Sequence, residues 1–144
     1  MASGDHLGTI LLVEDDTVTN LLHTRMIDRS GLVDHVDIAT DGIAALEYLN
    51  DKTIKDAPLP EVILLDINMP RMDGFEFLQE YAKLDAAAQP VKPMIIMLST
   101  SVLRADQERA EADPNVFRFI SKPIHAEDIV VFVKDYQEFS ASCC

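Results

Sequence analysis

Five short apolar segments, each followed by a segment of helical character, recur along this chain of 144 residues. A short run of valine, isoleucine and leucine bounded by turn residues is typical of a strand buried on both faces. The expected strands are 9–14, 36–39, 62–66, 94–99 and 116–120, and the expected helices are 17–30, 42–50, 74–84, 103–112 and 126–139. This alternation predicts a doubly wound α/β fold, a five-stranded parallel sheet with helices on both faces.

Two of the expected helices differ in how they should pack. In the first, Leu21, Leu22 and Met26 are expected to form the apolar stripe that faces the sheet. Gly31 stands where a helix usually ends. The helix at 103–112 is mostly charged, so we expect it to be largely exposed.

The length and the hydrophobic content of 48% fit one packed domain. We expect a flexible segment at residues 1–8, the domain at 9–139 and a tail at 140–144. The two cysteines, Cys143 and Cys144, are adjacent in that tail. Neighbouring cysteines of this kind form neither a disulfide framework nor a zinc site.

The net charge of −13 argues against a nucleic-acid partner, because an acidic surface repels the phosphate backbone. The longest apolar runs are far shorter than the ~20 residues that cross a bilayer. The first residues lack the basic and apolar regions of a signal peptide. We therefore expect a cytoplasmic protein without a membrane or nucleic-acid partner.

Acidic residues stand where strands of the expected sheet end. Asp15 and Asp16 follow the first strand, and Asp66 closes the third, which is strongly apolar. Ligands collect outside the carboxyl ends of the strands in open α/β sheets, so these acids would converge if the two strands are neighbours. Three carboxylates are suitable ligands for Mg²⁺. Acids at a helix start also serve as caps, which is the alternative explanation for the first pair.

A hydroxyl and a cation follow the last two strands. Ser99 ends the fourth strand, and Lys122 comes directly after the fifth. Both side chains can donate to a phosphoryl oxygen, and a lysine would also balance the acids. The four histidines lack ligand spacing and receive no role: His6, His23, His35 and His125.

These motifs together resemble the receiver domain of two-component response regulators. The resemblance rests on the acidic pair 15–16, on residues 66–70 continuing into 72–74, on Ser99 and on Lys122-Pro123. It implies a flavodoxin-like (βα)5 fold with strand order 2-1-3-4-5. It further implies a cis peptide bond before Pro123. Among receivers, the chain resembles in particular the single-domain receivers associated with phytochrome-type or hybrid kinases.

The same resemblance implies the chemistry. Asp66 would accept a phosphoryl group from a phosphohistidine of a sensor histidine kinase or a histidine phosphotransfer protein. Asp15, Asp16, Asp66 and the backbone carbonyl of Asn68 would hold Mg²⁺. Lys122 and Ser99 would contact the phosphoryl oxygens, and Ser99 and Phe119 would act as switch residues.

The expected output is protein–protein contact through the face made by segments 103–112, 116–120 and 126–139. That face would bind an unidentified downstream protein, and it also offers a surface for a homodimer. On this view the chain is a signalling protein that catalyses its own phosphorylation and slow dephosphorylation, not a turnover enzyme.

Three alternatives stay open. The chain could be a phosphorelay intermediate, or a degenerate receiver that binds partners without phosphate; the set of Asp66, its acidic neighbours and Lys122 speaks against the second. The third alternative is an aspartate-dependent phosphatase, which needs an acid two residues after its nucleophile as the general acid. Asn68 stands at that position, which argues against this alternative.

Overall fold

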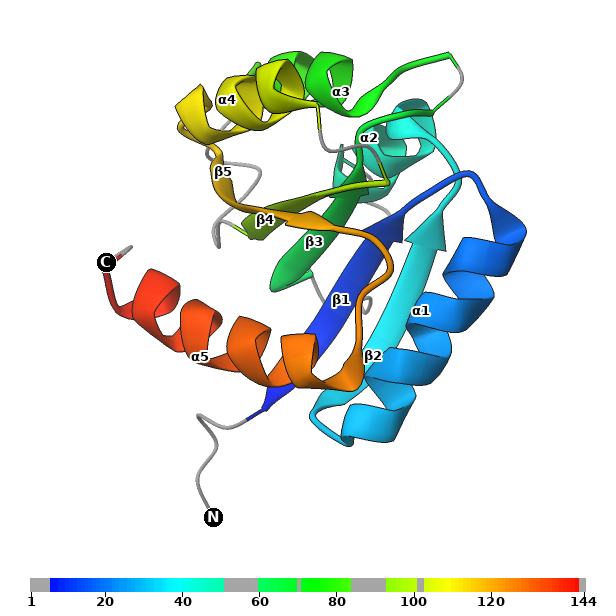
Figure 1. The fold of residues 1–144 in the computed structure, drawn as a ribbon, viewed down its shortest axis with the longest axis vertical. Coiled ribbons are helices and arrows are strands. Elements are labelled where there is room, and N and C mark those ends of the chain that lie inside the picture. Colours follow the sequence, from blue (N-terminus) through cyan, green and yellow to red (C-terminus); the bar gives the residue numbers. More distant parts are fainter. Residues whose placement is uncertain (1–5, 51–59, 70, 84–92, 101–102, 143–144) are drawn as a thin grey trace.

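The computed structural model describes residues 6–50, 60–69, 71–83, 93–100 and 103–142. These residues form one parallel sheet with strand order β2-β1-β3-β4-β5 (Figure 1). The strands are β1 (Leu7–Val13), β2 (Val33–Ala39), β3 (Val62–Asp66), β4 (Met94–Ser99) and β5 (Val116–Ser121). The expected fold class and strand order are thus confirmed.

A helix follows each strand. The helices are α1 (Thr17–Ser30), α2 (Gly42–Asn50), α3 (Gly74–Tyr81), α4 (Arg104–Ala112) and α5 (Ala126–Ser142). None of the described helices is long and apolar enough to cross a membrane. Gly31 ends α1 in the left-handed conformation, with a φ of 68°.

Successive residues of the central strands enter two different cores, because side chains alternate across a sheet. Leu11, Ile63 and Ile95 contribute to the core beneath α2, α3 and α4. Their neighbours Leu12, Leu64 and Ile96 contribute to the core beneath α1 and α5. Burial on both faces explains why these strands are continuously apolar.

Several boundaries differ from the sequence-based expectation. β1 begins at Leu7 and ends at Val13, one residue earlier than expected, so Glu14 belongs to the following turn. β2 begins three residues earlier than expected, because polar residues such as Asp34 and His35 are tolerated on an edge strand that pairs through its backbone with β1. α5 continues to Ser142, into the expected tail. Residues 1–5, Leu84 and both cysteines lie outside the described residues.

The expected apolar stripe of α1 is wrong. Leu21 and Leu22 are exposed by 55% and 38%. The buried residues of α1 are Asn20, His23 and Ile27, which share one face of the helix. α4 agrees with the expectation, since Ala110 is its one buried residue among those described.

Candidate functional site

The candidate site lies at the carboxyl edge of the sheet, and strand register assembles it. Val13 of β1 pairs with Leu65 of β3, so the next residues, Glu14 and Asp66, leave adjacent strands side by side. Leu98 of β4 pairs with Asp66. Ser99 in turn pairs with Ser121 of β5. The sheet therefore delivers side chains from four strands to one place.

Three carboxylates gather at this edge. Oxygen atoms of Glu14, Asp15 and Asp66 lie within 4.8 Å of one another. Glu14 and Asp66 are buried, with 4% and 3% of their surface exposed, whereas Asp15 is exposed. Loss of solvent around its carboxylate, followed by the hydrogen bond and charge of Glu14, raises the pKa of Asp15.

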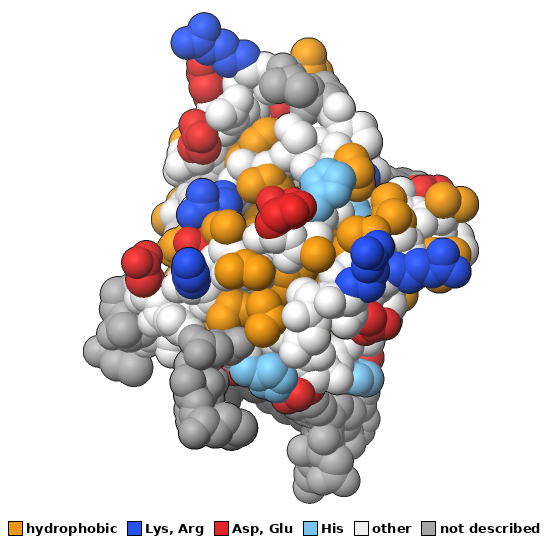
Figure 2. Space-filling model, turned by 60° about the horizontal axis from the view of Figure 1, so that its bottom comes forward, with side chains coloured by type: hydrophobic (Ala, Val, Ile, Leu, Met, Phe, Trp, Pro, Cys, Tyr) orange, Lys and Arg blue, Asp and Glu red, His pale blue; other side chains and the backbone are white. Residues whose placement is uncertain are grey.

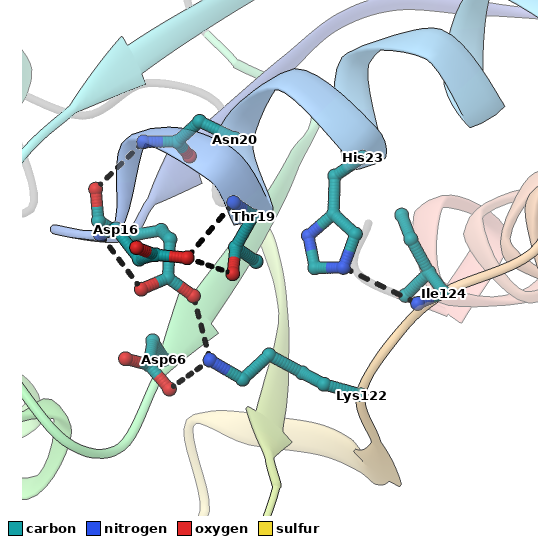
Figure 3. Close-up of polar contacts among 8 residues, drawn as sticks. Asp16, Thr19, Asn20, His23, Asp66, Lys122 and Ile124 are labelled. Carbon is teal, nitrogen blue, oxygen red and sulfur yellow. Dashed lines mark hydrogen bonds and ion pairs between the residues drawn. The ribbon is translucent and has the colours of Figure 1, made fainter.

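Lys122 bridges two of these acids (Figure 3). Its Nζ lies 2.7 Å from Oε1 of Glu14 and 2.9 Å from Oδ1 of Asp66. Burial alone would lower the pKa of Lys122, but the hydrogen bonds to Glu14 and Asp66 outweigh that effect and raise it. The ammonium group therefore stays charged at neutral pH and balances one of the three negative charges.

The backbone of Lys122 is hydrogen-bonded to the end of β4. Its N–H donates to the carbonyl of Ser99 at 2.8 Å. The Lys122-Pro123 peptide bond is cis, as the resemblance implies. Ser99 itself is fully buried at the end of β4. Lysine and serine are thus neighbours, as the sequence predicted from their strand ends.

Asp16 does not join the carboxylate group, which corrects one predicted position. It caps α1, where its Oδ2 accepts hydrogen bonds from the backbone N–H and the hydroxyl of Thr19. Those hydrogen bonds lower the pKa of Asp16. Glu14 takes the position expected of Asp16 because β1 ends one residue earlier than predicted. The register between β1 and β3 could have identified Glu14, because it places this residue beside Asp66.

The segment between β3 and α3 carries the remaining predicted ligand, Asn68, which is exposed. Gly74 closes this segment, with its N–H donating to the carbonyl of Ile67 at 2.8 Å. A Cβ at Gly74 would come within 2.6 Å of the Asp66 carbonyl oxygen. Gly74 therefore serves close approach of α3 to Asp66 rather than a left-handed turn. Pro70 lies outside the described residues.

Asp41, in the turn between β2 and α2, contacts the same segment through Arg71. Its buried carboxylate accepts from the N–H of Ala44 at 2.8 Å and from Nε of Arg71 at 2.9 Å. These two hydrogen bonds, the backbone one first, lower the pKa of Asp41. Arg71 itself adopts a positive φ of 65°.

We expect Asp41→Ala to lower the free energy of unfolding by about 1–2 kcal/mol, because it removes a helix cap and leaves Arg71 without its partner. Asp41→Asn should cost less, since asparagine also caps helices. Urea titrations of both variants measure the difference. Equal losses would show that the cap contributes little.

Phe119 is partly buried and packs against the core under α3 and α4.

His23 and Asn20 are functional candidates that the sequence did not suggest, because polar residues on a helix give no periodic signal. His23 is 1% exposed, and His6, His35 and His125 are exposed. Phe75 is buried in the core beneath α2, α3 and α4.

A (βα)5 sheet with buried acids and a lysine at its carboxyl edge defines a receiver domain of the two-component type. The family model described as response regulator receiver domain matches residues 10–134, and the chain belongs to this family.

Relatives support the assignment. The probable methanogenesis regulatory protein FilR2 of Methanothrix harundinacea is 33% identical over 90% of this chain and 81% of its own length. A two-component response regulator from Cytophaga hutchinsonii superposes with a TM-score of 0.82 at 29% identity, covering 92% of this chain and 98% of that one. The phosphorylated cyanobacterial phytochrome response regulator RcpA has a TM-score of 0.69 at 29% identity, with 96% of each chain covered.

Proposed function

We propose that Asp66 accepts a phosphoryl group from a phosphohistidine of a sensor kinase or a histidine phosphotransfer protein. The observation that carries the proposal is the ion pair between Lys122 Nζ and Asp66 Oδ1 inside a group of three carboxylates. A buried acid with this arrangement is costly to keep unless it has chemistry to perform. A solved relative described as phosphorylated supports the same assignment.

The residues at this edge fit a Mg²⁺ ion. Three carboxylates against one lysine leave two negative charges uncompensated, and hard oxygen ligands are what Mg²⁺ prefers. Glu14, Asp15 and Asp66 would hold the ion, together with the carbonyl of Asn68. When bound, the ion would neutralise charge on the transferred phosphoryl oxygens.

The transfer itself needs few groups. A carboxylate oxygen of Asp66 attacks phosphorus, the phosphorus–nitrogen bond to the donor histidine breaks, and its electron pair stays on the imidazole. Lys122 donates to a phosphoryl oxygen, and the Ser99 hydroxyl donates to another. Water later hydrolyses the acyl phosphate, which makes the modification reversible.

Output would follow from the added charge of about −1.5 to −2 at Asp66. Ser99 and Phe119 would shift and bias the α4–β5–α5 face between two conformations. That face exposes apolar side chains, including Leu103, Phe117 and Val130. Its occupant in this proposal is a downstream protein or a second copy of the chain.

Incubation with acetyl phosphate and Mg²⁺, followed by intact-mass measurement, tests the phosphoacceptor. The wild type should gain one phosphoryl group and Asp66→Asn none. Asp73→Asn is the matched control, because Asp73 lies in the same segment but caps α3 and stays outside the carboxylate group. A wild type without an adduct, or an undiminished adduct on Asp66→Asn, would contradict the proposal.

A further inference from the structure

The face of α1 that packs into the protein carries two polar side chains. Asn20 is 6% exposed and His23 is 1% exposed. Buried polar groups on a helix destabilise a protein unless they form hydrogen bonds. Both residues form one, and each bond leads to a segment of the candidate site.

Asn20 reaches the acidic turn. Its Nδ2 donates to the carbonyl oxygen of Glu14 at 2.9 Å (Figure 3). Glu14 is the residue whose carboxylate binds Lys122 and belongs to the carboxylate group. The hydrogen bond therefore fixes the backbone from which two of the three carboxylates project.

His23 reaches the lysine segment. Its Nε2 accepts a hydrogen bond from the N–H of Ile124 at 3.3 Å, a donor two residues beyond Lys122. This geometry requires a neutral ring with its proton on Nδ1. Burial, with the charge of Lys122 as a second cause, lowers the pKa of His23 to about 4, so the ring is neutral at pH 7.

Because residues three apart share a helix face, one rigid helix holds both sides of the site. We propose that Asn20 and His23 are positioning residues, which fix the acidic turn and the Lys122 segment relative to each other for phosphoryl transfer. This inference rests on the proposed function of Asp66. It assigns separate effects to the two side chains: Asn20 acts on the metal ligands, and His23 acts on the lysine.

Surface residues of α1 do not enter the inference. The apolar side chains on the outer side of α1, Val18, Leu21 and Leu22, are exposed. Figure 2 shows hydrophobic side chains gathered between charged and histidine side chains on the face seen there. The contacts of Asn20 and His23 lie on the opposite, buried side of the helix. A small-molecule phosphodonor needs no protein partner, so it tests these contacts independently of the outer surface of α1.

The test separates metal affinity from rate. Mg²⁺ affinity is measured by calorimetry with the metal alone, and phosphoryl uptake from acetyl phosphate is measured at saturating Mg²⁺. Asn20→Ala should weaken Mg²⁺ binding by about 5- to 10-fold, the worth of one hydrogen bond. His23→Leu should leave Mg²⁺ affinity near the wild-type value and slow uptake by a similar factor.

His23→Gln should restore the rate, because a glutamine side chain again offers an acceptor to the Ile124 N–H. The backbone amide proton of Ile124 should shift in the NMR spectrum of His23→Leu and return in His23→Gln. Thr24→Val is the matched control on α1: its buried hydroxyl has no hydrogen-bond partner among the described residues. All variants are assayed well below their melting temperatures.

Equal losses of rate in His23→Leu, His23→Gln and Thr24→Val would overturn the inference, since they would reflect general weakening of α1. Unchanged Mg²⁺ affinity in Asn20→Ala would overturn the role of Asn20. A wild type that takes up no phosphoryl group would instead contradict the function of Asp66. The metal titration and the Ile124 signal would still decide whether the two contacts position the site.

Discussion

Lys122→Met should lower the free energy of unfolding by about 3–5 kcal/mol in metal-free buffer at pH 7. Removal of one partner of a buried ion pair leaves the other charge without compensation, and that penalty is large. Here two buried carboxylates, those of Glu14 and Asp66, would lose the same cation. Urea titration in the presence of a chelator measures the loss, and methionine keeps the volume of the side chain.

Lys83→Met is the matched control for the change in net charge. Lys83 pairs with Glu80 at 2.9 Å, but its side chain is 71% exposed, so its removal should cost less than about 1 kcal/mol. If Lys122→Met costs no more than this control, Lys122 does not compensate buried charge.

A double variant tests the cause. Asp66→Asn removes one of the three carboxylates, so it should destabilise the protein little and should lessen the penalty of Lys122→Met when the two are combined. The non-additivity measures the coupling between the two side chains. Strict additivity would mean that the 2.9 Å contact carries no net interaction energy.

The sheet was predictable because its inner strands are buried on both faces. Segments such as Val62–Asp66 and Met94–Ser99 are apolar up to their last residue, and their bounds agree with the structure. β2 was less predictable, since an edge strand keeps its backbone pairing whatever its exposed side chains are. Its early residues Asp34 and His35 gave no apolar signal.

The site was predictable in its parts but not in its full set of ligands. Asp66, Ser99 and Lys122 each follow or close a strand, and parallel register must bring such residues together. The acidic pair depended on where β1 ends. A shift of one residue moved Glu14 into the carboxylate group and turned Asp16 into a helix cap.

The buried face of α1 was not predictable from hydrophobicity. Burial of a helix face is predicted from the spacing of its apolar residues, and that spacing predicted Leu21, Leu22 and Met26 as the buried stripe. The helix instead buries Asn20 and His23, because backbone groups of the site need hydrogen-bond partners there. The hydrogen bonds to those backbone groups outweigh the free-energy cost of leaving Leu21 and Leu22 exposed, which is modest.

His23 makes the stability of the protein depend on pH. The buried ring has a pKa of about 4 in the folded protein, against a usual value near 6.5 in the unfolded chain. Between these values the unfolded chain binds a proton that the folded protein does not, so acid favours unfolding. We expect stability to fall as pH drops from 6.5 to 4, by up to about 3 kcal/mol in all, and this contribution to level off below pH 4.

The difference between wild type and His23→Gln isolates this contribution, because glutamine keeps an acceptor for Ile124 and cannot titrate. Urea titrations from pH 7.5 to 4 should show the wild type losing stability relative to His23→Gln as pH falls, with a difference in slope of at most about 1.4 kcal/mol per pH unit. Carboxylates that titrate in the same range are common to both proteins and cancel. Parallel curves would mean that His23 accepts its proton as readily in the folded protein as in the unfolded chain, and that the ring is not held neutral by its place on the buried face of α1.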